Sequence, residues 1–553
     1  MVGEYSYLPA EGRRPRPSKK CKICICICFG VSAILALGIS FPPPFLILPP
    51  PTTTTTTTTP IVFSVSATLG DHMVLQRAPA SAMVWGFAPS GTAIKTVFDG
   101  RSYSAQATSD NVWRQQLMPT AAGGPYTISF SASSGESANL SDVLFGDVYV
   151  CGGQSNMEFE LFRNQNAYNF IEEANHYTDI RIFEVGEAHS KMPWMDLRVN
   201  QNWTNPGASG PFAPAIDLFS AVCWFFGKGI YDGLGGKVPI GLISSNLGST
   251  WISQWISPAT SLSCGYAPTG YPLPLPADVY NTMIVPLTVG PLTVTGFAWY
   301  QGENDCSDTY NYTCMQTALI THWRNAFRVP KAFWGIIQLA TMIGREYWKP
   351  RLKEHPELLP QFREQQLASG NLVPSFAWVT NADHGDGQNI HPPFKQYCGY
   401  RLANAALAMV YNKPIQWRSP TYKSAFAVGP GKVIVSLQDV TNAGLMLKPA
   451  ANAQIAHSAD LVWKFCARGP RGTCAWAELR FNDPDLTWVN ASIDLGTDNQ
   501  TIILSATPPT GATGILATSY AWGSVPMMTV YSADMDGEYA QLPVLAWNEH
   551  ISG

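Results

Sequence analysis

Four near-continuous apolar segments in the middle of the chain constrain the fold more than any other feature. They are Val238–Ser244, Thr295–Tyr300, Phe333–Leu339 and Ser375–Thr380. Each is short and bounded by turn-forming residues, which is typical of strands buried on both faces of a parallel sheet. Helical segments lie between and after them, most clearly Phe362–Ser369 and Lys395–Tyr411. The pattern predicts an α/β domain over residues 143–414.

The regions on either side of this domain have a different pattern. Residues 61–142 and 415–553 contain short apolar or alternating runs separated by Gly, Pro, Ser and Asn, which is typical of all-β modules. A chain of 553 residues is also too long for one ordinary core. We therefore predict a three-layer α/β/α domain with a parallel sheet, flanked by N- and C-terminal β-sandwich-like modules.

The first 60 residues predict a membrane anchor rather than part of a core. Basic residues between Arg13 and Lys22 precede an apolar run from Ile23 to Phe41. Such a run is long enough to span a bilayer, and basic residues on one side keep that side in the cytoplasm. We interpret 1–22 as a cytoplasmic tail, 23–41 as a transmembrane signal anchor and 42–60 as a Pro/Thr-rich stalk. A cleaved signal peptide, giving a secreted or lysosomal protein, is the alternative.

Composition and cysteine usage favour an exported protein that does not bind nucleic acid. The net charge of −4 offers no electrostatic footprint for nucleic acid. Glycosylation sequons follow the apolar run at Asn139, Asn202, Asn311, Asn490 and Asn499. Short spacing predicts the disulfides Cys306–Cys314 and Cys466–Cys474, and leaves Cys151, Cys223, Cys264 and Cys398 unassigned. No metal or other cofactor is predicted, and the oligomeric state stays open.

The segment Gly146–Leu161, GDVYVCGGQSNMEFEL, supplies a candidate nucleophile. A buried-strand pattern ends at Gly152 and Gly153, and a helix-compatible segment follows Ser155. The Ser155 hydroxyl is thereby predicted on a strand-to-helix turn at the carboxyl edge of the sheet. A serine needs a base to take its proton and donors to hold the oxyanion. Without them, the segment is only a tight turn with a helix N-cap.

Loops that follow three other predicted strands offer these groups. Gly248 is placed to bring a backbone N–H close to a bound acyl group, and the Asn304 amide offers a second donor. The loop after residue 380 offers His391 as a base. His384 competes with it, and we interpret His384 as a solvated loop residue.

The blocks GQSNM, a Gly-Ser-Thr loop, WYQGEND, NIHPPFK and YRLANAAL, in this order, resemble the sialate O-acetylesterase family of SGNH-type serine hydrolases. DHMVLQRAP, FREQQ and TSYAWGSVP are also similar, so the resemblance extends from about residue 60 to the end. It implies a carboxylic ester hydrolase that removes acetyl groups from sugar hydroxyls. It also implies that Ser155 is the nucleophile, that His391 is the general base, and that Gly248 and Asn304 join the Ser155 N–H in the oxyanion hole.

This chain departs from the family pattern at the position of the acid that would orient His391. Many relatives have Asp two or three residues before the His, where this chain has Asn389 and Gln388. Asp386 and Asp383 reach His391 only if their loop folds back. We favour Asp386, because it lies between two glycines that permit a turn. An amide can also accept the imidazole proton, but it stabilises imidazolium less than a carboxylate does.

Two other functions stay open at this point. The motifs specify acyl transfer and leave the sugar undefined, so an acetylated-polysaccharide (acetylxylan-type) esterase is one alternative. A catalytically weak glycan-binding surface protein is the other, because of the missing acid, the β modules and the stalk. In each case the expected partner is an O-acetylated sugar or glycan, with the membrane contacted through the N-terminal anchor.

We expect the full-length protein to stay membrane-bound with its enzyme domain in the lumen or outside the cell. Basic residues lie only before the apolar run, and all five sequons lie after it. Detergent phase separation measures this, and the protein should enter the detergent phase. Recovery in the aqueous phase, with an N-terminus near Ser40, would show that the segment is cleaved.

Overall fold

The structure, a computed structural model, describes residues 61–208, 214–265, 276–306, 311–344, 349–458, 471–533 and 537–551. Residues from Pro60 onward form one compact unit. The predicted tail, anchor and stalk lie outside the described residues. Across the described ranges, no helix is long and apolar enough to cross a bilayer.

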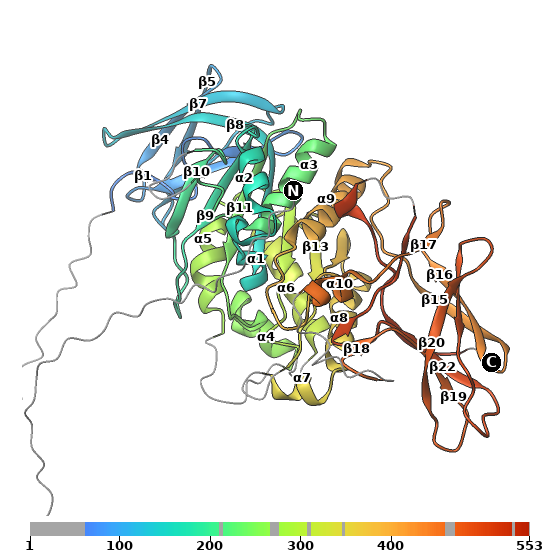
Figure 1. Cartoon of the computed structure of the whole chain (residues 1–553). Coiled ribbons are helices and arrows are strands. Elements are labelled where there is room, and N and C mark those ends of the chain that lie inside the picture. The colour runs from blue at the N-terminus through green and yellow to red at the C-terminus, as the bar shows by residue number, and fades with distance from the viewer. Residues whose placement is uncertain are drawn as a thin grey trace, which may run out of the picture. The chain divides into compact units, whose positions relative to one another are not determined.

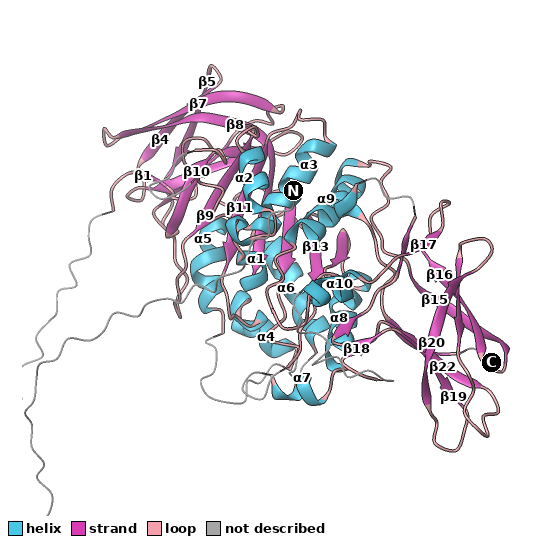
Figure 2. Ribbon diagram, in the orientation of Figure 1, coloured by secondary structure: helices cyan, strands magenta, loops and turns pink. Residues whose placement is uncertain are grey.

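A mixed sheet forms the centre of the unit (Figures 1 and 2), with the strand order β10-β9-β11-β8-β12-β13-β14. Neighbours from β9 to β14 are parallel, and β10 is antiparallel to β9. The four predicted strands are confirmed, each within two residues of its expected bounds. The strands are β8 Ser137–Gly153, β9 Ile180–Val185, β10 Val199–Thr204, β11 Ile240–Asn246, β12 Gly296–Tyr300, β13 Phe333–Gln338 and β14 Phe376–Thr380.

Helices lie on both faces of this sheet (Figure 2). Cys151 and Gly152 are successive residues of β8, so they point to opposite faces. Cys151 is disulfide-bonded to Cys223 of α3 (Ala221–Gly233), whereas a Cβ on Gly152 would lie 2.9 Å from Trp323 of α6 (Tyr312–Ala326). The mixed α/β class is thereby confirmed.

Two further long helices pack against α3 and α6. α9 contacts α3, and its bounds, Lys395–Tyr411, are those predicted. α8 (Leu358–Ala368) contacts α6. The shorter helices are α1 Ser155–Glu158, α2 Ala167–Ala174, α4 Pro258–Ser263, α5 Val285–Thr288, α7 Pro350–Glu354 and α10 Ala451–Ser458.

The N-terminal strands are built onto the first part of β8. β7 pairs with β8 and with β4, β4 pairs with β5, and β2 pairs with β8, while β1, β3 and β6 form a separate sheet. Because β8 continues into the central sheet, the expected boundary at residues 142 and 143 falls inside one strand. The strands are β1 Ser64–Val65, β2 Val74–Gln76, β3 Met83–Phe87, β4 Ala93–Phe98, β5 Arg101–Gln106, β6 Val112–Gln116 and β7 Gly123–Ala132.

After α9 the chain forms a seven-stranded antiparallel sheet in the order β15-β16-β21-β20-β19-β22-β25. Two small sheets, β17-β24 and β18-β23, accompany it. The strands are β15 Thr421–Gly429, β16 Lys432–Gln438, β17 Leu445–Leu447, β18 Cys474–Ala475, β19 Ala477–Phe481, β20 Trp488–Leu495, β21 Thr501–Ser505, β22 Ile515–Tyr520, β23 Val525–Pro526, β24 Val530–Ser532 and β25 Trp547–His550.

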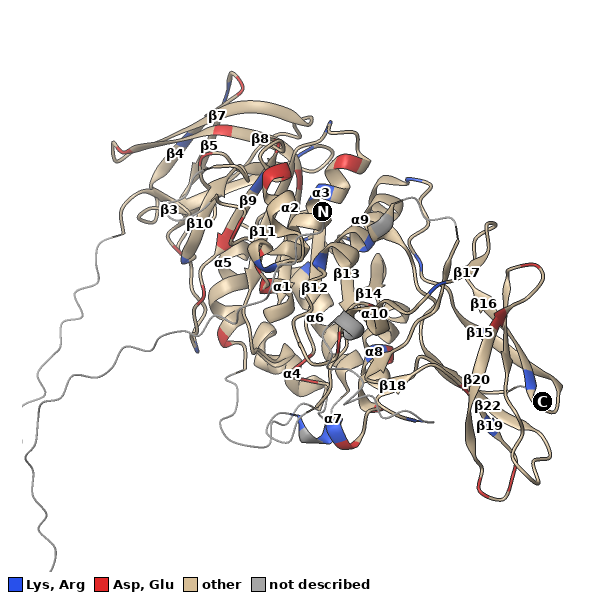
Figure 3. Ribbon diagram, viewed as in Figure 1, with Lys and Arg blue, Asp and Glu red and all other residues tan. Residues whose placement is uncertain are grey.

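Charged residues are sparse, and the two signs are interspersed along the described ribbon (Figure 3). This distribution agrees with the 13% charged composition. The asparagines of all five sequons are exposed. Glycans at these positions would therefore not disturb the core.

The cysteine pairing differs from the prediction. Cys314 pairs with Cys264, so the predicted Cys306–Cys314 bond is wrong. Cys264 caps the C-terminus of α4 and Cys314 lies in the first turn of α6, and these helices are in contact. Cys306 is buried, and its thiol donates to the Glu303 carbonyl at 3.4 Å. Cys474 is disulfide-bonded, but its predicted partner Cys466 lies outside the described residues.

Removing the Cys264–Cys314 bond with paired Ala substitutions should lower the free energy of unfolding by about 2–4 kcal/mol. The bond links residues 50 positions apart, and a cross-link of that span restricts the unfolded chain. Denaturant titration measures the change. Non-reducing peptide mapping is the control, and a Cys306–Cys314 peptide would contradict the pairing.

Candidate active site

Ser155 lies where β8 gives way to α1, as the sequence predicts. Gly153 has a φ of 146°, and a Cβ there would lie 2.1 Å from the Tyr300 carbonyl oxygen, so only glycine fits. The Gln154 N–H donates to that same carbonyl at 3.1 Å. The Gln154 side-chain oxygen accepts from the Gly302 N–H at 3.2 Å. The turn is thereby fixed to the end of β12.

His391 approaches Ser155 from the loop that precedes α9. Its Nε2 lies 2.7 Å from the Ser155 Oγ. Burial, with Lys395 and Arg163, lowers the pKa of His391 to about 4, and Glu160 opposes this shift. The imidazole is therefore neutral at pH 7, which is the form that accepts a hydroxyl proton.

The two predicted oxyanion donors both lie near Ser155. Asn304 lines a cavity of about 370 Å³ together with Ser155 and His391. A Cβ on Gly248 would lie 3.4 Å from the Ser155 Cβ and 2.9 Å from a Glu158 carboxylate oxygen. The Gly248 backbone donates a hydrogen bond to Glu158, whose pKa is raised by burial and by Glu187. Asn304 thus lines the cavity, while the Gly248 N–H has a carboxylate partner.

Asp386 is engaged with its own loop. Its Oδ1 accepts from the backbone N–H groups of Gln388 and Asn389, both at 2.8 Å. The Asn389 Oδ1 in turn accepts from the backbone N–H of His391 at 2.9 Å. Among the described residues no hydrogen bond joins Asp386 to the His391 ring. The two side chains shape the backbone before His391, and the assignment of Asp386 as the orienting acid stays a prediction.

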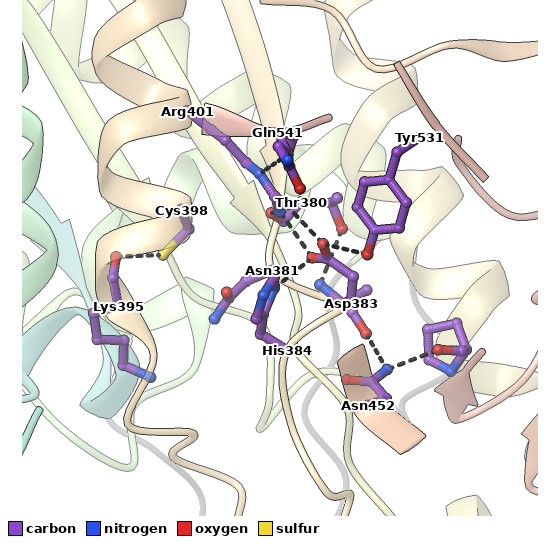
Figure 4. Close-up of polar contacts among 12 residues, drawn as sticks. Thr380, Asn381, Asp383, His384, Lys395, Cys398, Arg401, Asn452, Tyr531 and Gln541 are labelled. Atoms are coloured by element: carbon purple, nitrogen blue, oxygen red, sulfur yellow. Dashed lines mark hydrogen bonds and ion pairs between the residues drawn. The ribbon is translucent and has the colours of Figure 1, made fainter. Parts of the chain in front are cut away.

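Asp383 is committed to a buried ion pair (Figure 4). Its carboxylate accepts from the Arg401 guanidinium at 2.8 and 2.7 Å and from the Tyr531 hydroxyl at 3.1 Å. Although burial raises the pKa of Asp383, Arg401 and His384 hold it well below its ordinary value. This cluster ties α9 to the C-terminal strand β24.

The interpretation of His384 as a solvated loop residue is wrong. Its side chain is buried, and its ring stacks on Tyr397 with the centroids 3.5 Å apart. Burial lowers the pKa of His384. The local sequence, Asp-His-Gly, indicates a turn and does not show that α9 brings Tyr397 over the ring.

Sequence reasoning missed three buried polar residues beside Ser155, namely Asn156, Glu303 and Lys395. Asn156 donates to Glu303, and Lys395 donates to Asn156. Each lies inside a sequence block quoted above, next to or near a candidate site residue. The available signal was a charged residue, Glu303 or Lys395, within the same motif as Asn304 or His391.

The side chains gathered here suit acyl transfer. Ser155, His391 and Asn304 line one cavity, and their hydroxyl, neutral imidazole and amide are the set of groups that a serine hydrolase needs. In the part of the chain that the structure describes, no three His, Cys, Asp or Glu side chains are grouped to hold a metal ion.

Several known proteins with similar sequences or structures are acetylesterases. A family described as "Carbohydrate esterase, sialic acid-specific acetylesterase" matches residues 145–407. Sialate O-acetylesterase from Homo sapiens is 32% identical over 393 residues, covering 64% of this chain and 72% of that protein. The Mus musculus enzyme is 30% identical over 424 residues, covering 66% and 76%. A carbohydrate acetylesterase from Xanthomonas citri matches with a TM-score of 0.69 and 26% identity, over 88% of this chain and 99% of that chain.

Replacing Asn304 with Ala should lower kcat by roughly 10²–10³ and leave KM nearly unchanged. An oxyanion donor binds the tetrahedral state more strongly than the ester. Steady-state kinetics with an aryl acetate measure both constants. Asn325→Ala, at an exposed position of α6, is the matched control. A folded Asn304→Ala variant with wild-type kcat would remove Asn304 from the site.

The rate constant kcat/KM should stay level down to about pH 5 and fall as the pH drops through about 4. Protonated His391 cannot accept the Ser155 proton, and burial places its pKa at about 4. A pH profile of kcat/KM on the folded enzyme measures this limb. A limb near 6.5, the ordinary value for His, would mean that His391 is solvated in the free enzyme.

Proposed function

Because this chain belongs to the sialate O-acetylesterase family of carboxylic ester hydrolases, we propose that it removes O-acetyl groups from sialic acids or related glycans. The contact of 2.7 Å between the His391 Nε2 and the Ser155 Oγ carries this proposal. The matching family is described as sialic acid-specific, and this description supports a sialic acid as the sugar.

In the proposed reaction, the Ser155 Oγ attacks the acetyl carbonyl carbon while the His391 Nε2 takes the hydroxyl proton. The carbonyl oxygen becomes an oxyanion. When the tetrahedral intermediate collapses, the bond from the acetyl carbon to the sugar oxygen breaks, and His391 returns the proton to that oxygen. Water then attacks the acetyl-serine, with His391 again as the base, and acetate leaves as the Ser155 hydroxyl re-forms.

Three donors are assigned to the oxyanion. Asn304 lines the cavity, and the Ser155 N–H, at the start of α1, has no acceptor within the helix. Gly248 joins them if its N–H turns from Glu158 toward the substrate. Asp386 remains our candidate for the acid that orients His391 and stabilises its imidazolium form. If so, Asp386→Asn lowers kcat/KM by about tenfold or more.

We also propose an SGNH-hydrolase-like, three-layer α/β/α arrangement for residues 143–414, between β-sandwich-like modules at 61–142 and 415–553. The parallel strands β9 to β14, with helices on both faces, support it. Residues 23–41 are proposed to anchor the chain, with the enzyme outside the cell or in the lumen. The five exposed sequons support that orientation.

Acetate release from a panel of O-acetylated sialosides and acetylated xylosides tests the function. Wild-type protein should release acetate from sialosides and react with a fluorophosphonate probe, and Ser155→Ala should do neither. Release from xylosides alone would change the substrate class. Sialoside binding without acetate release or labelling would favour a glycan-binding protein instead.

A further inference from the structure

The backbone on both sides of His391 is held by buried side chains. The Asn156 Nδ2 donates to the carbonyl oxygen of Ile390 at 2.9 Å. The Lys395 Nζ donates to the carbonyl oxygen of Pro392 at 2.8 Å. Any shift of the segment that carries the imidazole therefore breaks two hydrogen bonds, one of them from a charged donor.

These two side chains are also bonded to each other and to a carboxylate. The Lys395 Nζ donates to the Asn156 Oδ1 at 2.5 Å, and the Asn156 Nδ2 donates to Glu303. The ammonium lies 4.7 Å from the centroid of the Phe159 ring and 5.8 Å from that of Tyr300, where cation–π attraction adds to the hydrogen bonds. Lys395 stands apart from Arg401, which lies on the same helix and pairs with Asp383 (Figure 4).

The three residues belong to the three segments that build the site. Asn156 directly follows Ser155, Glu303 directly precedes Asn304, and Lys395 begins α9 just after His391. One chain of hydrogen bonds thus joins the turn of the nucleophile, the loop of the oxyanion donor and the loop of the base.

The burial of these groups has a large desolvation cost. Asn156 and Lys395 have no exposed surface and Glu303 has 2%. Burial lowers the pKa of Lys395 to about 8, against the influence of Cys398 and Glu303, so the ammonium persists at pH 7. Apolar residues of similar volume often stabilise a core as well as buried charges do, so stability alone does not explain this arrangement.

We propose that Lys395, Asn156 and Glu303 form a positioning brace for His391. The brace contributes to the orientation of the base that a carboxylate provides in a Ser-His-Asp triad, and it acts on the backbone instead of the ring. It keeps the Nε2 within reach of the Ser155 Oγ, and the ammonium disfavours imidazolium in the resting site. The inference rests on the proposed roles of Ser155 and His391.

Lys395→Met tests the brace, because it keeps the length of the side chain and removes both the charge and the donors. We expect kcat to fall about tenfold or more with KM within about twofold. The acid limb of kcat/KM should move to higher pH, since the other charges facing His391, Arg163 and Glu160, are unchanged. Lys413→Met, at an exposed position just after α9, is the matched control and should behave as wild type.

Asn156→Ala is the second variant, because it leaves the buried ammonium in place. Its kcat should fall by about the same factor, while its acid limb stays near that of wild type. If Lys395→Met does not fold, the kinetics of Asn156→Ala alone test the brace.

Wild-type kcat in either folded variant overturns the brace. The brace is also overturned if the acid limb of kcat/KM in folded Lys395→Met lies at the same pH as in the wild type. Acetate release by Ser155→Ala would instead overturn the proposed function, so the two failures are distinguishable.

Discussion

The site depends on the register of three parallel strands. Gly153 of β8 is the register partner of Asn246 in β11 and of Tyr300 in β12. The loops that carry Ser155, Gly248 and Asn304 therefore leave the sheet at the same level. A side chain at position 153 would meet the Tyr300 carbonyl, so the close approach of β8 and β12 requires glycine there. Shifting any one strand would separate the Ser155 hydroxyl from the proposed oxyanion donors.

His391, the proposed general base, is subject to a different constraint. Its ring is partly desolvated and has cationic neighbours, so it is a neutral but weak proton acceptor. In the described structure no carboxylate is hydrogen-bonded to the His391 ring. Stabilisation of the imidazolium therefore lowers the activation barrier less than it does in a Ser-His-Asp triad. A larger share of the rate enhancement must then come from donors preorganised toward the oxyanion and from the fixed geometry of the base. A rigid backbone around His391 is what such a site requires.

Two buried ionic clusters flank α9 and have different consequences. Arg401 and Asp383 join the central domain to β24. Lys395 contacts the segment that carries His391. One helix thus fixes both the C-terminal strands and the loop that carries His391, because Arg401 and Lys395 extend from α9 toward different segments.

The sequence by itself determined the parallel strands, the bounds of α9, the turn at Ser155 and the candidate pair Ser155 and His391. These follow from local periodicity, from glycines at turns and from the order of motifs, all of which are readable along the chain. Tertiary structure decided the partner of Cys314, the burial of His384, the engagement of Asp386 with its own loop and the contacts of Lys395. Each of these depends on contacts between side chains that are far apart in the sequence. The packing of the layers determines these contacts, and closeness in sequence does not predict them.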